Sequence, residues 1–306
     1  MREYLAPIKW DIHLSAELET PQRLDLLQRA QWWIDYKEAR DVLHRLEQIM
    51  RYGPGRVRPP NILLVSPSNN GKSMLIEKFR RDHTPEPTEG TDVENLPIIV
   101  LQMPTRPTFN RFYAELLAEL GAPHSRWFRS QDMERVALKT LRAASARILI
   151  IDELHNMLAG SGTARREFLN VLRYLGNTLR IPIVGAGTHE AYLAIRTDAQ
   201  LENRFEPIIL PLWEPGTEAA TLMMSFATSL PLRRASYDLL RGDVIRAIIS
   251  RTGGHIGEIL ALLRAAAIIA IETGEEEIND RALRTAHYKG PLERRTIIER
   301  RLSGVL

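Results

Sequence analysis

The chain has 306 residues, a formal net charge of +3 and no cysteine. This length suits one main domain with smaller additions, and the lack of cysteine excludes disulfides, thiolate catalysis and cysteine-ligated zinc. So small a net charge does not by itself indicate a nucleic-acid partner. No apolar run approaches the roughly 20 residues that cross a bilayer, and the first residues lack the pattern of a signal peptide. We therefore expect a cytoplasmic protein without a membrane partner.

The N-terminal part is predicted to be helical. Apolar residues recur at three- and four-residue spacing in two stretches of 22–50, which predicts two helices. The stretch RYGPGRVRPP at 51–60 then combines glycines and prolines that end a helix. We place a boundary here, between an N-terminal helical extension (1–57) and a domain that begins at residue 58.

Strand and helix patterns then alternate five times. Short, nearly continuous apolar runs, as in strands buried on both faces of a parallel sheet, occur at 61–66, 97–102, 147–152, 181–186 and 206–212. Helical patterns lie at 72–82, 109–120, 133–146, 165–179 and 189–195. This alternation predicts an α/β domain over 58–212 with a doubly wound, five-stranded parallel sheet. We interpret 83–97, rich in proline and acidic residues, as a polar connection.

Only helical patterns follow Trp213. They occupy 218–230, 237–252, 256–274 and 280–288, and they predict a small helical domain over 213–290. The tail at 291–306 contains a basic cluster from Arg294 to Arg301. This cluster could bind DNA, contact a partner or simply be a solvated helix end.

The stretch VSPSNNGKSM, at 65–74, is close to the phosphate-binding pattern G-x-x-x-x-G-K-[ST], although serine replaces the first glycine. In such a loop, backbone N–H groups surround a phosphate at a helix N-terminus. An isolated GKS would favour a simple turn, but the predicted strand before it and helix after it favour a nucleotide site. Asn69 and Asn70 tolerate left-handed backbone angles and can curve the loop. The predicted nucleotide contacts are Ser66, Pro67, Ser68, Asn69, Asn70, Gly71, Lys72, Ser73 and Met74.

A second motif, RILIIDELHN, contains an acidic pair after a predicted strand. A carboxylate at the C-terminal end of a parallel strand lies where open α/β sheets bind ligands. Asp152 could orient Mg²⁺ through its water shell, and Glu153 could polarise a water for in-line attack on a terminal phosphate. The pair could instead begin a helix, because acidic residues favour first turns. The phosphate-binding pattern upstream favours the catalytic interpretation.

The histidines give little support for a metal site. Glu153 and His155 are two residues apart, which on a helix puts them on different faces. Neither H-E-x-x-H nor G-x-S-x-G occurs. We interpret His155, His189 and His255 as packing or polar-surface residues.

With these motifs in this order, the chain resembles AAA+ ATPases, and in particular the TniB branch, the transposition regulators related to TnsC. The resemblance runs from about Gln22 to Gly274 and is most specific between Leu149 and Trp213. It rests on SNNGKSMLIEKF, LIIDELHNMLAGS, REFLNVLRYLGN, IPIVGAGTHEAYLAIRTDAQLENRFEPIILPLW and GGHIGEI. It implies a P-loop AAA+ fold with N-terminal helices and a C-terminal helical lid.

The resemblance also implies roles for single residues. Lys72 and Ser73 match the Walker A lysine and the magnesium-binding hydroxyl. Asp152 and Glu153 match the Walker B pair. Thr188 lies where such ATPases have a polar sensor near the terminal phosphate.

Arg204, in the stretch ENRFEP, matches the arginine finger that a neighbouring subunit inserts into the site. Such a cation balances charge that grows on the transferred phosphoryl group. From the residues alone, Arg204 could instead form a surface ion pair with Glu202 or Glu206.

One departure from the family pattern concerns the lid. Many AAA+ lids carry a second sensor arginine, but Gly257 and Glu258 occupy its expected place here. Arg251 or Arg264 could substitute for it.

The resemblance implies an ATPase of the bacterial cytosol that uses Mg²⁺ and forms a homo-oligomeric ring or filament on double-stranded DNA. It would recruit a transposase together with a target-selection adaptor, with hydrolysis controlling assembly. Arg106 and Arg111 are predicted to contact DNA phosphates without base readout, although both could be solvated loop charges.

Two alternatives share these motifs. A helicase loader or replication-initiator ATPase would differ in its partner, and a signalling ATPase would use nucleotide to gate protein contacts without DNA. A metabolic phosphoryl-transferase fits less well, because the acidic pair, Arg204 and the helical lid suit hydrolysis in an oligomer.

Overall fold

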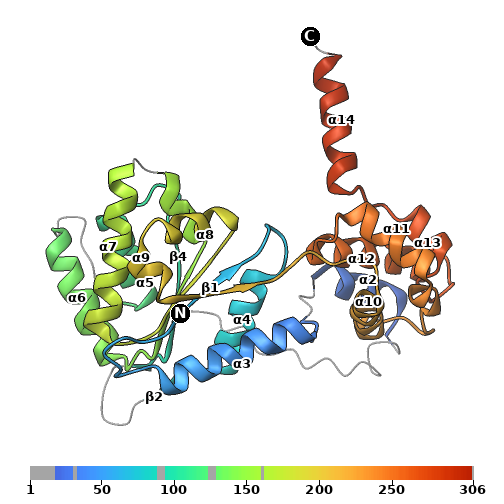
Figure 1. Ribbon diagram of the computed structural model, residues 1–306. Helices are drawn as coiled ribbons and strands as arrows, with labels where there is room; N and C mark the ends of the chain where they lie inside the picture. Colours follow the sequence, from blue (N-terminus) through green and yellow to red (C-terminus); the bar gives the residue numbers. More distant parts are fainter. Residues whose placement is uncertain (1–17, 30–32, 88–93, 123–128, 160–161, 305–306) are drawn as a thin grey trace. The chain divides into compact units, whose positions relative to one another are not determined.

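The computed structural model describes residues 18–29, 33–87, 94–122, 129–159 and 162–304 (Figure 1). The chain forms two compact units. The first, here called the α/β unit, contains Lys37–Ser68 and Lys72–Pro211. The second, here called the helical unit, contains the described part of Met1–Tyr36, the loop residues Asn69–Gly71, and Leu212 onward.

Five parallel strands form the main sheet of the α/β unit, in the order β4-β5-β6-β1-β7. These strands are β1 (Asn61–Val65), β4 (Ile98–Gln102), β5 (Ile148–Asp152), β6 (Ile183–Gly187) and β7 (Phe205–Ile209). In the register, Leu63 lies between Gly185 of β6 and Pro207 of β7. The predicted five-stranded parallel sheet is therefore confirmed. The predicted connection at 83–97 additionally contains a short antiparallel pair, β2 (Glu86–Pro87) and β3 (Glu94–Asn95).

Helices pack on the sheet because its strands are apolar on both faces. Alternate strand residues, such as Leu63 and Leu149, belong to a core with helices α5 to α9. The intervening residues, such as Ile62 and Ile150, are equally buried, and Figure 1 draws α3 and α4 on this other side. The helices of this unit are α3 (Lys37–Tyr52), α4 (Lys72–Asp82), α5 (Phe109–Glu119), α6 (Ser130–Ala143), η1 (Leu154–Ala159), α7 (Gly162–Leu179), α8 (His189–Arg196) and α9 (Ala199–Glu202).

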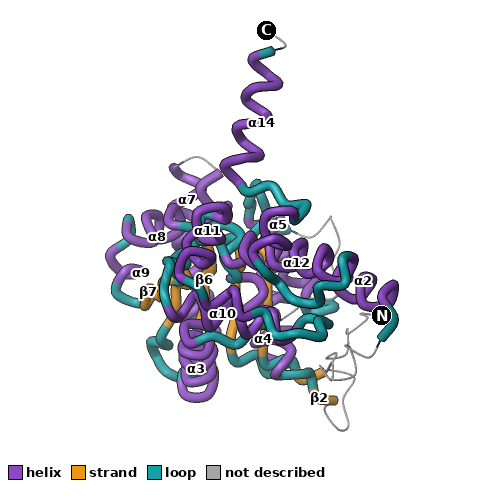
Figure 2. The backbone as a smooth tube through the Cα atoms, turned by 90° about the vertical axis from the view of Figure 1, so that its right-hand side faces the viewer, coloured by secondary structure: helices purple, strands orange, loops and turns teal. Residues whose placement is uncertain are grey.

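The helical unit is built around the apolar helix α12. Helices α2, α10, α11 and α13 contribute side chains to the same core. Figure 2 labels α2, α10, α11 and α12 among its purple helices. The bounds of its helices are α2 (Thr20–Arg29), α10 (Thr217–Ser229), η2 (Tyr237–Leu240), α11 (Gly242–Thr252), α12 (Ile256–Glu272), α13 (Asp280–Thr285) and α14 (Pro291–Ser303).

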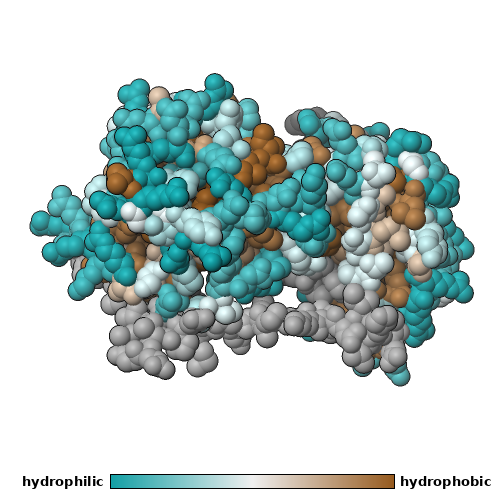
Figure 3. Space-filling model, turned by 60° about the horizontal axis from the view of Figure 1, so that its bottom comes forward, coloured by the Kyte–Doolittle hydropathy of each residue, from teal (hydrophilic) through white to brown (hydrophobic). Residues whose placement is uncertain are grey.

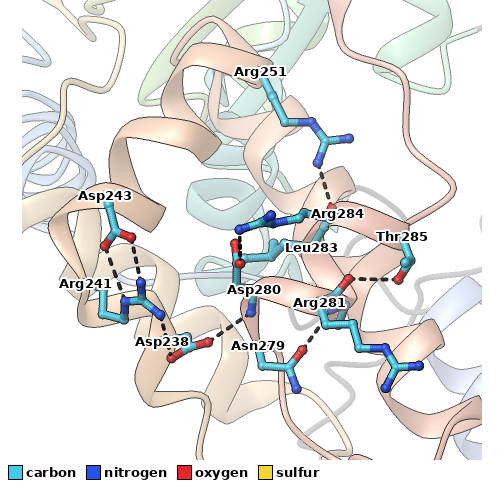
Figure 4. A network of polar contacts seen from close by, with 11 residues as sticks. Asp238, Arg241, Asp243, Arg251, Asn279, Asp280, Arg281, Leu283, Arg284 and Thr285 are labelled. Atoms are coloured by element: carbon cyan, nitrogen blue, oxygen red, sulfur yellow. Dashed lines mark hydrogen bonds and ion pairs between the residues drawn. The ribbon is translucent and has the colours of Figure 1, made fainter.

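One predicted helix, at 237–252, is interrupted. Arg241 has an extended backbone that ends η2 and caps α11, and its side chain pairs with Asp238 and Asp243. Asp238 also accepts the backbone N–H of Asp280 at 2.9 Å, which ties η2 to the start of α13 (Figure 4). The break is therefore stabilised by polar contacts that apolar periodicity does not reveal.

Within the described ranges, no single helix is both long and apolar enough to span a membrane. The pair α11 and α12 meets the criteria only when taken together, and it bends by 116° at the break. On the face drawn in Figure 3, hydrophilic residues prevail and apolar ones form smaller patches.

A buried ion pair holds α2 in the helical unit. Arg23 is 1% exposed, and its guanidinium donates to both carboxylate oxygens of Glu276 at 2.7 and 2.9 Å and to the carbonyl of Pro231 at 3.1 Å. The hydrogen bond from Arg23 is the main cause that lowers the pKa of Glu276. Removing Glu276 would leave the buried guanidinium of Arg23 without its carboxylate. Removing Arg23 would leave Glu276 with only Arg233, whose Nη1 lies 3.7 Å away.

We expect Arg23→Met to lower the free energy of unfolding by about 3–5 kcal/mol, the usual effect of breaking a buried pair. Arg29→Met on the same helix is the control, because Arg29 and Asp25 are exposed and such pairs contribute less than about 1 kcal/mol. The Arg23 contribution should be complete above the ordinary glutamate pKa of about 4.3 and disappear as the pH falls through the lower folded value. Urea denaturation at several pH values measures both effects, and equal losses in the two variants would contradict the prediction.

Candidate nucleotide-binding site

The predicted phosphate loop connects β1, which ends at Val65, to α4, which begins at Lys72. Two of its residues have left-handed backbone angles, Asn69 with φ of 58° and Gly71 with φ of 88°. Asparagine tolerates this conformation better than most residues, and glycine adopts it without steric cost. The loop therefore curves at Asn69 and Gly71.

Serine is compatible with the position of the missing first glycine. The backbone N–H of Ser66 donates to the carbonyl of Gly187 at 3.0 Å, which extends the contact between β1 and β6 by one residue. Such an extended backbone is also what Pro67 imposes on the residue before it, so no glycine is required. The other predicted contacts follow along the loop: Pro67 and Ser68 are exposed, Asn70 is buried, and Met74 is half-buried in the first turn of α4.

Lys72 lies inside the loop. It is 5% exposed, and its Nζ donates to the carbonyls of Ser66 at 2.8 Å and Pro67 at 2.9 Å. Burial lowers the pKa of Lys72, and the charges of Glu153 and Asp152 act in the opposite direction. The ammonium group therefore lies where a phosphate-binding loop needs a cation, within range of both acidic residues.

The fold brings together the two residues predicted to hold magnesium. Ser73 and Asp152 are 79 positions apart, yet Ser73 Oγ donates to Asp152 Oδ2 at 2.7 Å. The other carboxylate oxygen of Asp152 accepts the backbone N–H of Glu153 at 2.8 Å. Mg²⁺ prefers hard oxygen ligands and usually takes one or two from the protein and the rest from phosphates and water. This oxygen pair fits Mg²⁺, and the described residues contain no cluster of three acidic, histidine or cysteine side chains suited to a metal.

Glu153 meets His155, a contact that the sequence analysis missed. His155 Nε2 lies 3.1 Å from Glu153 Oε2, whereas helical spacing was expected to separate them. The expectation was wrong because Glu153 precedes η1 and has a left-handed φ of 53°. The His155 Nδ1 atom is buried and has no hydrogen-bond partner in the described part of the chain. The signal in the sequence is only the spacing E-x-H, which does not show the backbone turn that joins the two side chains.

Thr188 follows β6 directly and caps the start of α8. Its hydroxyl donates to a carboxylate oxygen of Glu190, and this bond is the main cause that lowers the pKa of Glu190. Since β6 lies between β5 and β1, Thr188 lies on the same edge of the sheet as the loop and the acidic pair. Thr188, which is predicted to be a polar sensor, therefore directly follows the strand that lies between them.

Arg204 lies at the opposite end of the strands from the phosphate loop, where β1 begins. The backbone N–H of Asn61, the first residue of β1, donates to the carbonyl of Arg204 at 3.1 Å. The loop begins a full strand away, about 16 Å at 3.3 Å per residue, which exceeds the length of an arginine side chain. Arg204 therefore cannot reach the phosphate loop of its own chain.

The surroundings of Arg204 also differ from the surface ion pair considered above. Its Nη1 donates to Asn177 Oδ1 at 2.8 Å. Glu202 pairs with Arg196 at 3.3 Å, and Glu206 pairs with Arg45 at 2.6 Å. The two neighbouring carboxylates thus have other cationic partners.

The remaining candidate arginines fall into two groups. Arg106 and Arg111 are exposed between β4 and the first turn of α5. In the helical unit, Arg251 donates to the carbonyls of Leu283 at 2.7 Å and Tyr288 at 3.3 Å. Burial lowers the pKa of Arg264. Arg251 therefore connects α11 to the segment around α13.

A model of the TniB family, described as bacterial TniB protein, matches residues 23–215, more than half of the chain. Among curated proteins, the ATP-binding subunit ClpE of the ATP-dependent Clp protease of Bacillus subtilis (strain 168) is 32% identical over 114 residues. That match covers 36% of this chain and 15% of ClpE, so the chain spans less than a sixth of this relative.

Three solved structures share the fold. ORC2 of Aeropyrum pernix, in a structure of its ADPNP-ADP complexes, matches with a TM-score of 0.61 and 15% identity over 85% of this chain and 70% of that chain. Cdc6p of Pyrobaculum aerophilum has a TM-score of 0.56 and 14% identity, covering 83% and 67%. ORC1 of Aeropyrum pernix, in complex with DNA, has a TM-score of 0.50 and 17% identity, covering 81% and 63%. Such identities show the fold alone, and they confirm the expected P-loop AAA+ architecture.

Gly71→Ala should weaken ATP binding by about 5–30-fold, because a side chain in the left-handed region costs about 1–2 kcal/mol. Gly121→Ala is the matched control, since Gly121 also has a positive φ, of 63°, with open space around it, and lies at the end of α5. We expect both variants to lose stability but only Gly71→Ala to lose affinity, as measured by titration with a fluorescent ATP analogue. Equal affinities would show that the loop does not require this backbone conformation.

Proposed function

The chain belongs to the TniB family, and we propose that it is an Mg²⁺-dependent ATPase that regulates DNA transposition by assembling on double-stranded target DNA. The contact between Ser73 and Asp152, beside the buried ammonium of Lys72, carries the nucleotide part of this proposal. Two motifs that are distant in the sequence meet there. They supply the cation and the oxygen ligands that a magnesium nucleotide needs.

The side chains at this edge of the sheet would divide the work of ATP hydrolysis. Lys72 and the backbone N–H groups of the loop would bind the phosphates, and Ser73 and Asp152 would hold Mg²⁺, which would neutralise phosphate charge. Glu153 would orient a water molecule for in-line attack and accept its proton. Thr188 would donate a hydrogen bond to the terminal phosphate or to that water.

The position of Arg204 supports a site completed by a second copy of the chain. It lies at the far edge of the sheet from its own phosphate loop, so it would act only on the nucleotide of a neighbour. Hydrolysis would then depend on assembly into a ring or filament. We propose the division inferred above for this assembly: helical extension 1–57, nucleotide-binding domain 58–212, lid 213–290 and basic tail 291–306.

Duplex DNA is the proposed template for assembly, with a transposase and a target-selection adaptor as further partners. Family membership supports this proposal, and Arg106 and Arg111 are exposed, as phosphate contacts must be. Such contacts would give little sequence preference and a strong salt dependence. Binding to random duplex DNA that requires ATP and weakens with salt would exclude a signalling ATPase without DNA.

The fold similarity to ORC2 and Cdc6p over more than four fifths of this chain favours a second candidate, a replication-initiator or helicase-loading ATPase. It would share the nucleotide site and differ in its partner. Co-purification with a replicative helicase in place of a transposase would support this second candidate.

We expect Glu153→Gln to bind ATP and accumulate on DNA, because the neutral amide keeps the shape of the site but cannot accept a proton. Its hydrolysis rate should fall by about 100-fold or more. Lys72→Ala should lose both nucleotide binding and assembly, since the loop loses its cation. Electron microscopy with duplex DNA and a non-hydrolysable ATP analogue measures assembly. Wild-type coating of DNA by Lys72→Ala would contradict the nucleotide switch.

Arg204→Ala should lower hydrolysis at saturating protein by about 1,000-fold, the typical effect of removing an arginine finger. Mixing it with Glu153→Gln should restore part of the activity, because Glu153→Gln subunits would supply Arg204 to the intact sites of their neighbours. Arg196→Ala, which removes a half-exposed pair with Glu202, is the control and should hydrolyse ATP normally. A mixture no more active than its separate components would remove Arg204 from this role.

A further inference from the structure

The start of α12 contacts the loop residues that belong to the helical unit. The backbone N–H of Ile256 donates to Asn70 Oδ1 at 3.2 Å, and that of Gly257 donates to the carbonyl of Asn69 at 3.1 Å. A Cβ atom at Gly257 would lie only 2.0 Å from Asn69 Oδ1. The first turn of α12 therefore fits closely around Asn69 and Asn70.

Glu258, the next residue of α12, extends these contacts. It is 9% exposed, and its Oε1 accepts from Asn69 Nδ2 at 3.2 Å. Its Oε2 accepts from the hydroxyl of Tyr288 at 2.7 Å, and Arg294 of α14 donates to Oε1. The carboxylate thus connects a residue of the phosphate loop to the C-terminal helix.

The ionised form of Glu258 is stabilised by these partners. Burial acts to raise the pKa of Glu258, but hydrogen bonds from Tyr288 and Arg294 outweigh it, and the pKa is lowered. A negative charge next to a loop that binds phosphate opposes the binding of an anion. Arg294 offsets that charge through the ion pair.

We propose that Glu258 and Arg294 form a positioning pair for the phosphate loop, in which Glu258 holds Asn69 in its curved conformation and Arg294 cancels the carboxylate charge. This inference rests on the proposed binding of ATP. Glu258 occupies the position at which many related lids carry an arginine. In this chain a glutamate at that position orients the loop, and Arg294 of α14 supplies the positive charge.

The pair also makes the affinity for ATP depend on α14. No residue of this helix is buried, and the helix extends from the other helices of its unit in both views (Figures 1 and 2). A ligand that took Arg294 away from Glu258 would leave the carboxylate charge uncompensated beside the loop. The affinity for ATP would then fall.

The test compares Arg294→Ala with Arg295→Ala on the same helix. Arg295 pairs with Glu299, and both are exposed, so this control removes an equal charge without touching Glu258. We expect the Kd for ATP, measured by titration of the full chain at fixed salt, to rise about tenfold in Arg294→Ala and to change less than twofold in Arg295→Ala. The rate at saturating ATP should stay near the wild-type value in both.

The double variant Arg294→Ala with Glu258→Gln separates charge from a purely structural role. The glutamine oxygen can still accept from Asn69, but it carries no charge, so the Kd should return to within about threefold of the wild type. A wild-type Kd in Arg294→Ala, or a double variant that binds more weakly than Arg294→Ala, would overturn the inference. If the folded wild-type chain bound no ATP, the proposed function itself would fail. Tight binding by the wild type together with an unaffected Arg294→Ala would refute only the positioning pair.

Discussion

The candidate site depends on the position of β6 between β1 and β5. All three strands are parallel, so their carboxyl ends meet at one edge of the sheet, where ligands of such sheets bind. The loop after β1, the acidic pair after β5 and Thr188 after β6 are thereby brought together although they are far apart in the sequence. The bond between Ser73 and Asp152 forms because this strand order places the start of α4 opposite the end of β5.

The same edge combines the buried ammonium of Lys72 with the partly exposed carboxylates of Asp152 and Glu153. Burial disfavours the charged form of Lys72, while Asp152 and Glu153 favour it. Glu153 also has the His155 ring as a neighbour, because its left-handed backbone turns the side chain toward that ring. The contact with His155 Nε2 gives the Glu153 carboxylate a defined position, as the proposed orientation of a water would require.

Much of the architecture could be predicted from the sequence. Four of the five strands lie within one or two residues of the apolar runs, because strands buried on both faces have few polar residues inside them. The fifth strand, β7, ends three residues before its predicted run does. Contacts that depend on a special backbone conformation could not be predicted. Arg241 interrupts a helical pattern through its ion pairs, and helical spacing gave the wrong expectation for Glu153 and His155. The contacts of Asn69 and Asn70 with α12 join residues almost 190 positions apart, which no local pattern reveals.

Some of the candidate site residues could also be located from the sequence, whereas the position of others required the structure. Candidate residues in a fixed motif, such as Lys72 and Ser73, could be located because strand, loop and helix follow one another along the chain. For Arg204, the motif suggested a role, but only the contact with Asn61 shows that the residue lies at the far edge of the sheet. A cation that is too far from its own phosphate loop cannot assist hydrolysis in a single chain. If Arg204 is the catalytic cation, hydrolysis by this chain must wait for a neighbour, and the nucleotide state then reports whether the chain has assembled.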